Sequence, residues 1–161
     1  MKLWILRHAQ AEGTSRTGLD IDRRLTKAGQ MACHHLKEQL DTLGLKPPRA
    51  QWVSPSARTR QTAEMALAGW PDAEIVIEPA LWEASLGDLL ALIERHQAES
   101  GQQDLLLVGH NPGLEMLIEW LGGELPVPGL KPGTLVVVEV DTPPTPDSAR
   151  TLQRFPPIES R

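Results

Sequence analysis

The chain has 161 residues, enough for one domain with a sizeable hydrophobic core. Apolar residues make up 40% of it and charged residues 23%, which is an ordinary globular composition. The net charge of −5 argues against a non-specific nucleic-acid binder, although it leaves room for a local basic cleft. We therefore expect a single domain over residues 1–161 and no nucleic-acid partner.

The chain carries one cysteine, Cys33, so no internal disulfide can form. No apolar stretch approaches the roughly 18 residues that a membrane helix needs. The apolar run after Met1 is too short for a signal peptide, and charge follows it at Arg7. These features predict a cytoplasmic protein without a membrane partner. Cys33 is expected to be a small buried residue, because no arginine follows it at the short spacing that a cysteine-dependent phosphatase needs.

Strand-like and helix-like patterns alternate along the chain. In chain order we expect a strand at Leu3–Leu6, a helix from Thr26 to Leu43, a strand at Gln51–Val53, a helix at Arg58–Leu67, a strand at Glu74–Ile77, a helix at Leu86–Gln97, a strand at Leu105–Val108, a helix at Gly113–Leu121 and a strand at Leu135–Val140. Residues 142–161 begin as a proline-rich loop and include a possible last strand at Thr151–Phe155. This alternation predicts an α/β fold, a three-layer sandwich with a mostly parallel central sheet and helices on both faces.

Basic side chains follow three of these strands. They are Arg7 and His8 after the first strand, Arg58 shortly after the second, and His110 after the strand Leu105–Val108. Because ligands bind outside the carboxyl ends of parallel strands, we expect these side chains to meet on one rim of the sheet. Arginine forks match phosphate oxygens, and a neutral imidazole can act as a nucleophile when an acceptor holds its other ring nitrogen. The pattern favours a site for a phosphoryl dianion.

In combination these segments resemble the histidine phosphatase superfamily, with its phosphoglycerate mutase-like fold, and above all the small SixA-type phosphohistidine phosphatases. The resemblance rests on Arg7-His8, Ser54-Pro55-x-x-Arg58-x-x-Gln61-Thr62 and Gly109-His110. It implies that His8 is the nucleophile that becomes phosphorylated. It also implies that Arg7, Arg58 and His110 bind the phosphoryl group, and that no metal or other cofactor takes part.

Two further residues have roles that the sequence leaves open. Residues 20–29 resemble the family segment Asp-x-x-Arg-Pro-Leu-Thr-x-x-Gly, with Arg24 in place of the proline. Within this segment Arg23 is either a substrate-binding residue or a surface arginine that anchors a loop. Glu83 follows the third strand, where many relatives have a general acid, but it could equally be a residue at a helix start that favours the helix dipole.

Three functions remain compatible with these residues. They are a phosphatase for phosphohistidine on a protein, a phosphatase for a small ester such as a sugar phosphate, and a non-catalytic phosphate-binding module. The interval from Arg58 to His110 is too short for the lid segment of a mutase, and the resulting open site favours a protein substrate. The presence of both arginines and both histidines disfavours the binding module. The physiological substrate and the oligomeric state do not follow from the sequence.

Three other patterns are set aside. Asp20-Ile21-Asp22 looks like the paired aspartates of magnesium-dependent phosphatases, but no apolar strand precedes it. His34 and His35 are adjacent on a helix, so they point in different directions and make a poor metal pair. His96 belongs to a polar helix end, and we expect it to be solvated.

Overall fold

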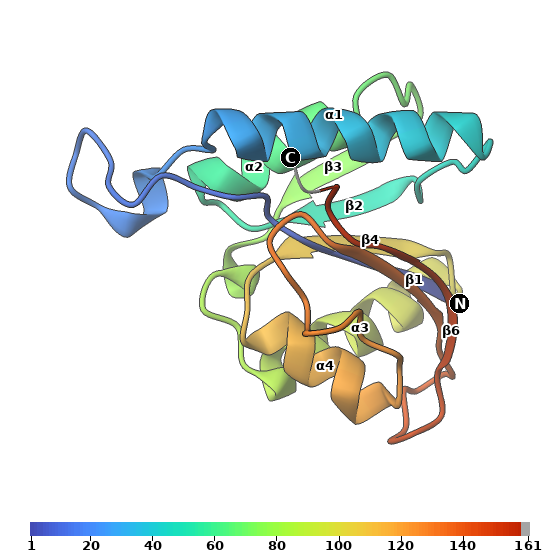
Figure 1. The fold of residues 1–161 in the computed structure, drawn as a ribbon. Helices are drawn as coiled ribbons and strands as arrows, with labels where there is room; N and C mark the ends of the chain where they lie inside the picture. Colours follow the sequence, from blue (N-terminus) through green and yellow to red (C-terminus); the bar gives the residue numbers. More distant parts are fainter. Residues whose placement is uncertain (159–161) are drawn as a thin grey trace.

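The computed structural model describes residues 1–158, in which one sheet lies between two layers of helices (Figure 1). The strands are β1 (Lys2–Arg7), β2 (Ala50–Val53), β3 (Glu74–Ile77), β4 (Leu105–Gly109), β5 (Leu135–Glu139) and β6 (Arg150–Phe155). The helices are α1 (Lys27–Thr42), α2 (Ala57–Ala66), α3 (Leu86–Ser100) and α4 (Gly113–Leu121), with short 3-10 helices at Asp20–Asp22 and Pro79–Leu81. The α/β sandwich and the strands and helices expected from the sequence are confirmed. The sequence did not predict the two short 3-10 helices.

The sheet has the strand order β3-β2-β4-β1-β5-β6. Strands β3, β2, β4 and β1 are parallel to one another, whereas β5 runs antiparallel to β1 and to β6. The carboxyl ends of β1, β2 and β4 therefore share one edge. Strands β1 and β4, which lie side by side at the centre, bring two segments about 100 residues apart in the sequence into direct contact.

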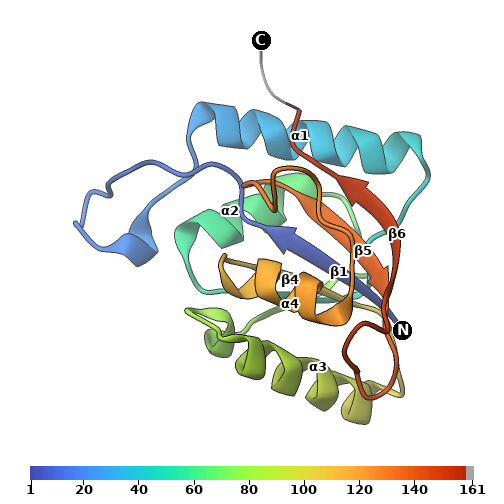
Figure 2. The ribbon, with the colours of Figure 1, turned by 60° about the horizontal axis from the view of Figure 1, so that its bottom comes forward.

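The two faces of the sheet bury separate halves of the core. In β1 the side chains alternate, with Leu3 and Ile5 packing on the α3 and α4 side, and Trp4 and Leu6 on the α1 and α2 side. Figure 1 shows α1 and α2 above the sheet and α3 and α4 below it, and Figure 2 shows the same layers after a turn of the molecule. The central position of β1 explains why its apolar run is continuous, because both faces are covered.

Serine and threonine caps start three helices at defined points. Thr26 accepts a hydrogen bond from the backbone N–H of Gly29 at the start of α1, and Ser56 accepts one from Thr59 at the start of α2. At α3, Ser85 and Asp88 form a reciprocal capping box. These caps fix where each helix leaves the rim of the sheet, so the residues of the first turns are placed reproducibly near the strand ends.

His96 corrects one expectation. It is buried, not solvated, because α3 continues to Ser100 and the histidine lies inside the helix. Its Nε2 lies 2.8 Å from the carbonyl oxygen of Gln103, and its ring meets Trp52 edge-on at 5.3 Å. The Trp52 ring and the Gln103 carbonyl together accommodate the buried imidazole.

Other expectations meet the structure only in part. Cys33 is buried, as expected, and burial raises the pKa of its thiol to about 11. No helix within residues 1–158 is long and apolar enough to cross a membrane. The last strand forms as β6 after the proline-rich loop. The assignment of residues 1–161 to a single domain stays a prediction, and residues 159–161 lie outside the described part.

Candidate functional site

The register between β1 and β4 brings the two candidate histidines together. Arg7 is paired with Gly109, so His8 and His110 are the next residues on two adjacent parallel strands. The backbone N–H of His8 donates to the carbonyl oxygen of Gly109 at 3.1 Å. The two imidazole centroids are 5.4 Å apart. The expectation that these residues share one rim is therefore confirmed by the strand pairing.

His8 has the geometry of a neutral imidazole with one nitrogen free. Its Nδ1 lies 2.7 Å from the carbonyl oxygen of Ala9, which can only accept, so Nδ1 carries the proton and donates. Nε2 then bears the lone pair. The pKa of His8 is lowered to about 4, mainly by burial, with the Ala9 carbonyl acting against the shift and the nearby Arg58 and Arg7 adding to it. At neutral pH the ring is uncharged and can act as a nucleophile.

Arg7 keeps most of its donors available. Its Nη1 donates to the carbonyl oxygen of Leu130 at 2.8 Å, and its Nε is buried without a partner among the described residues. Burial lowers the pKa of Arg7, whereas Glu115 raises it, and an arginine remains charged in either case. The Leu130 carbonyl thus fixes the direction of the guanidinium and leaves the rest of the fork for an anion.

Arg58 lies in the first turn of α2, directly beyond the end of β2. Its side chain is nearly buried, and its Nη1 and Nη2 donate to the backbone oxygen and to Oδ2 of Asp20 at 2.8 and 3.0 Å. The guanidinium carbon lies 5.4 Å from the centroid of Trp82. A buried cation that is held on one side by a carboxylate and on another by an aromatic ring is well ordered before any ligand arrives.

His110 is held from behind by a buried serine. Its Nε2 lies 2.7 Å from Oγ of Ser54, and its ring meets Trp82 edge-on at 5.2 Å. The pKa of His110 is lowered to about 3, mainly by burial, with His8 and Arg58 adding to the shift and Asp20 acting against it. In the free protein His110 is therefore neutral at pH 7, like His8.

These side chains line one cleft of about 760 Å³ at the carboxyl ends of the strands. All six candidates from the sequence contribute to its lining, namely Arg7, His8, Arg23, Arg58, Glu83 and His110. The start of α4 at Gly113 also borders it, and a helix N-terminus favours an anion. The apolar part of its lining includes Trp82, Leu86, Pro112, Met116 and Pro132. The cleft thus combines cationic and apolar side chains.

Arg23 anchors a loop and also borders the cleft, and its role in substrate binding stays a prediction. Its Nε donates to Oδ1 of Asp20 at 2.8 Å and its Nη1 donates to the carbonyl oxygen of Glu12, so it anchors the loop. It also lines the cleft. Asp20 links Arg23 to Arg58, and these two hydrogen bonds hold the pKa of Asp20 below its usual range even though burial raises it. Sequence reasoning gave Asp20 no place in the site, although it opens the family-like segment 20–29.

Glu83 is an exposed residue on the cleft with an unusual backbone. Its φ of 54° lies in the left-handed region, which non-glycine residues rarely adopt. The capping hydrogen bonds at the start of α3 come from Ser85 and Asp88. A left-handed backbone at a residue that lines a cleft is typical of a functional position, and both readings of Glu83, as a general acid and as a residue that favours the helix dipole, stay predictions.

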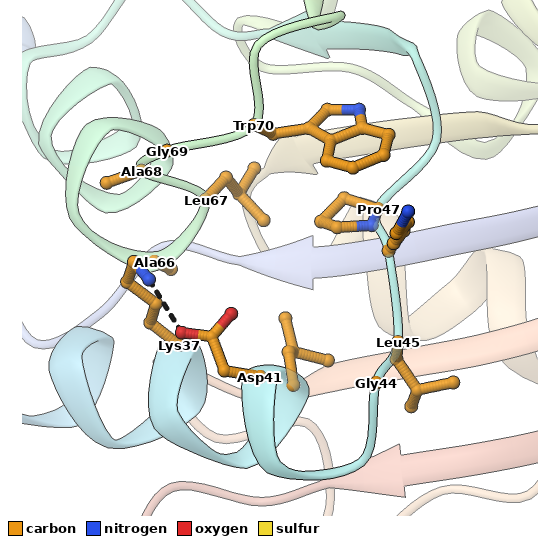
Figure 3. A pocket seen from close by; sticks show the side chains of 12 residues that line it. Lys37, Asp41, Gly44, Leu45, Pro47, Ala66, Leu67, Ala68, Gly69 and Trp70 are labelled. Carbon is orange, nitrogen blue, oxygen red and sulfur yellow. Dashed lines mark hydrogen bonds and ion pairs between the residues drawn. The ribbon is translucent and has the colours of Figure 1, made fainter.

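A second cavity, of about 260 Å³, lies away from these residues (Figure 3). It lies between the end of α1 and the end of α2, where Lys37 and Asp41 form an ion pair of 2.7 Å beside Leu67 and Trp70. None of the candidate phosphoryl-binding residues lines it. Within residues 1–158, no group of three or more His, Cys, Asp or Glu side chains is arranged to hold a metal ion.

Comparison with solved structures gives neighbours that match almost end to end. The putative phosphohistidine phosphatase SixA from Agrobacterium tumefaciens is 27% identical, with a TM-score of 0.80 over 97% of this chain and 98% of that chain. The putative SixA from Nakamurella multipartitia is 23% identical, with a TM-score of 0.77 over 98% and 96%. A putative alpha-ribazole-5'-P phosphatase from Escherichia coli is 18% identical, with a TM-score of 0.66 over 94% and 95%. The last two likenesses concern the fold alone.

Sequence comparison gives the family. No curated protein sequence matches the chain. The profile of the histidine phosphatase superfamily (branch 1) matches residues 3–92, which is more than half of the chain and runs from β1 into α3. This stretch contains Arg7, His8 and Arg58, and β4 adds His110 at the same rim. The chain belongs to the histidine phosphatase superfamily, branch 1.

Proposed function

We propose that the chain is a metal-independent phosphohistidine phosphatase that acts on a phosphorylated protein through a phospho-His8 intermediate. The observation that carries the proposal is the Nδ1–H bond of His8 to the Ala9 carbonyl, which leaves the Nε2 lone pair of a neutral ring at a cleft with two arginines. The 27% identity to a putative phosphohistidine phosphatase over nearly the whole chain supports the same substrate class.

In the first half of the reaction, Nε2 of His8 attacks phosphorus and the bond from phosphorus to the substrate nitrogen breaks. The leaving imidazole takes the electron pair of that bond and receives a proton from Glu83, so it departs as a neutral ring. Arg7, Arg58 and His110 donate to the three phosphoryl oxygens, whose charge grows in the transition state. Positive side chains supply the charge stabilisation that a metal ion supplies in other phosphatases.

In the second half, water attacks phosphorus and the bond to Nε2 of His8 breaks. The carboxylate of Glu83 takes the proton from water, and inorganic phosphate leaves with the neutral ring of His8 restored. Both halves use the same donors. The phosphoryl group stays between Arg7 and Arg58 while it passes from the substrate nitrogen to Nε2 of His8 and then to water. The chain thus returns to its starting protonation state after one turnover.

The apolar residues that line the cleft favour phosphohistidine over a sugar phosphate as the substrate. Trp82, Leu86 and Met116 offer contact area to a planar ring and its protein surroundings, but they offer few partners to sugar hydroxyls. Between Arg58 and His110 the described chain contains only α2, β3, a short 3-10 helix, α3 and β4, without an added lid. A phosphatase for a small ester is the alternative, and the same assay separates the two.

The test is release of phosphate from a phosphohistidine-bearing carrier protein in the presence of a chelator. The wild type should release phosphate and His8→Ala should not, because no other side chain at the rim replaces the Nε2 nucleophile. His34→Ala is the matched control, since His34 is an exposed residue of α1 that should leave the rate unchanged. Acid-labile labelling of the wild-type chain, absent in His8→Ala, would identify the intermediate.

Other outcomes would redirect the proposal. Loss of turnover on addition of chelator would contradict metal independence. Rapid turnover of a small ester, with none on the carrier protein, would leave the His8 chemistry in place and replace the substrate. Phosphate affinity without turnover on either substrate would mean a binding module.

A further inference from the structure

The hydroxyl of Ser54 has one hydrogen-bond partner, and that partner is His110. Ser54 directly follows β2 and is completely buried. Its backbone N–H donates to the carbonyl oxygen of Val108, and its own carbonyl oxygen accepts from Oγ1 of Thr59 at 2.6 Å. Its Oγ lies 2.7 Å from Nε2 of His110 and has no other partner among the described residues. Hydrogen bonds thus hold both the backbone N–H and the carbonyl of Ser54, and its hydroxyl points at the imidazole of His110.

The position of the proton in this contact follows from elimination. A buried hydroxyl that cannot donate leaves an unsatisfied O–H group, which costs about 1–3 kcal/mol. The only acceptor within reach is Nε2 of His110, so the Ser54 O–H donates and Nε2 accepts. A neutral imidazole that accepts at Nε2 carries its proton at Nδ1.

We propose that Ser54 is a positioning residue that holds His110 as the Nδ1–H tautomer, so that this histidine presents an N–H donor to the transferring phosphoryl group. Nε2 is turned to Ser54, which does not line the cleft, whereas His110 does. Nδ1 has no hydrogen-bond partner within residues 1–158 and is the ring nitrogen left for a ligand. The catalytic part rests on the proposed function, while the tautomer stands without it.

The two histidines of the site are then the same Nδ1–H tautomer, but they turn opposite nitrogens to the cleft and have opposite tasks. His8 donates at Nδ1 to the Ala9 carbonyl and keeps a lone pair at Nε2 for attack. His110 accepts at Nε2 from Ser54 and keeps an N–H at Nδ1 for donation. The other tautomer of His110 would aim a lone pair at the phosphoryl oxygens, and the repulsion would raise the barrier. Residues at the ends of β1 and β2, the strands on either side of β4, thus assign a nucleophile and a donor to chemically identical rings.

The first test is nitrogen NMR of the uniformly labelled wild-type protein near neutral pH. His110 should show a protonated Nδ1 and an unprotonated Nε2, and His8 should show the same pattern with its Nδ1 bonded to Ala9. In Ser54→Ala, His110 should shift toward a mixture of both tautomers while His8 stays unchanged. A protonated Nε2 in wild-type His110 would overturn the proposal, whether or not the protein is active on any substrate.

The second test is kinetic and uses three variants. Ser54→Ala should lower kcat by roughly tenfold, the worth of one neutral hydrogen bond, with KM nearly unchanged, and Ser54→Thr should restore most of the loss because it keeps a hydroxyl. Ser148→Ala is the matched control, since the Ser148 hydroxyl also makes one hydrogen bond, to the carbonyl oxygen of Thr145 at 2.7 Å, and Ser148 does not line the cleft. Its His110 tautomer and its kcat should match those of the wild type.

The kinetic readout also includes pH. The charged and titratable groups that act on His110 are His8, Arg58, Asp20 and Arg7. Because Ser54→Ala removes no charge, the acidic limb of kcat/KM that reports His8 should stay in place while the plateau drops. An unchanged kcat in Ser54→Ala with an altered tautomer would overturn the catalytic part. Inactivity of the wild type on every phosphorylated substrate would instead refute the proposed function and leave the NMR result to decide the tautomer.

Discussion

At the scale of single residues, the protonation of the two histidines separates this site from an ordinary imidazole pair. Burial is the main cause that lowers the pKa of His8 to about 4 and that of His110 to about 3. An unperturbed imidazole titrates near 6.5. Both rings of the free protein therefore remain neutral throughout the physiological range, which suits a nucleophile but leaves His110 a neutral donor.

The first prediction concerns this titration. In the free protein, proton–carbon NMR should show no charge change of His8 or His110 between pH 8 and about pH 5.5. Added tungstate or phosphate should raise the pKa of His110, because a nearby dianion favours the imidazolium. Titration of either ring near pH 6.5 in the absence of an anion would mean that water reaches the rings more freely than their burial implies.

Asp20 supplies a second prediction at this scale. Its carboxylate lies against Arg58 and Arg23, where it orders the arginines but also opposes an incoming dianion. Asp20→Asn should therefore strengthen inhibition by inorganic phosphate up to about fivefold at low salt, and less at high salt, since the carboxylate is largely exposed. Asp22→Asn is the control, because the Asp22 carboxylate accepts from Thr17 and, within residues 1–158, from no other side chain. Weaker inhibition in Asp20→Asn would mean that ordering of Arg58 outweighs repulsion.

Residue types and spacing were enough to predict His8, Arg7, Arg58 and His110 as neighbours, because each follows a strand and parallel strands end at one edge. They were not enough for the partners of these residues. The Leu130 carbonyl that holds Arg7 is 123 positions away, in a segment without a helix or strand pattern. The Ser54 hydroxyl could be placed at the rim, but its partner depends on the register of two strands that do not adjoin in the sequence.

At the scale of elements, the start of α4 is pressed against the segment that carries Trp82 and Glu83. A Cβ atom added at Gly113 would collide with the carbonyl oxygen of Ala84 and would lie 3.3 Å from Leu89. Only a glycine lets α4 begin so close to that segment. This contact couples the phosphate-binding end of the cleft to the side that holds the candidate acid.

Gly113→Ala is the third prediction. The collision should displace the segment 82–85, lower the free energy of unfolding by about 1–3 kcal/mol, and reduce kcat more than phosphate affinity. Gly87→Ala is the matched control on α3, because its new Cβ would meet only Ser85 at 3.7 Å and alanine favours a helix. That control should unfold at the same or a higher temperature. Equal stability of Gly113→Ala and the wild type would show that segment 82–85 moves aside at no cost in free energy.

At the scale of the whole molecule, the same buried histidines make the fold sensitive to acid. In the unfolded chain both rings have a pKa near 6.5, and in the folded chain the values are about 4 and 3. Below pH 6.5 the unfolded state therefore binds more protons than the native state. The free energy of unfolding falls as the pH drops, and it keeps falling until the native rings take up protons.

The fourth prediction follows from this fall in the free energy of unfolding at lower pH. Between pH 6.5 and 4.5 each histidine should contribute a slope of up to about 1.4 kcal/mol per pH unit to the free energy of unfolding. Urea unfolding across this range should give a shallower slope in His8→Asn and in His110→Gln than in the wild type, and an unchanged slope in His34→Ala. Carboxylates such as Asp20 and Glu78, whose pKa values are lowered, act mainly below this window. Parallel slopes in all four proteins would contradict the prediction.

The pairing of β1 with β4 also dictates when the site can exist during synthesis. His8 leaves the ribosome roughly a hundred residues before His110, which directly follows β4. Strand β5, whose neighbour Thr134 accepts from the Arg7 backbone, comes later still. A growing chain has the nucleophile and both arginines but lacks His110 until β4 has joined the sheet. Activity is therefore a reporter of completed folding, and a ribosome-stalled chain truncated before residue 105 should remain unable to accept a phosphoryl group.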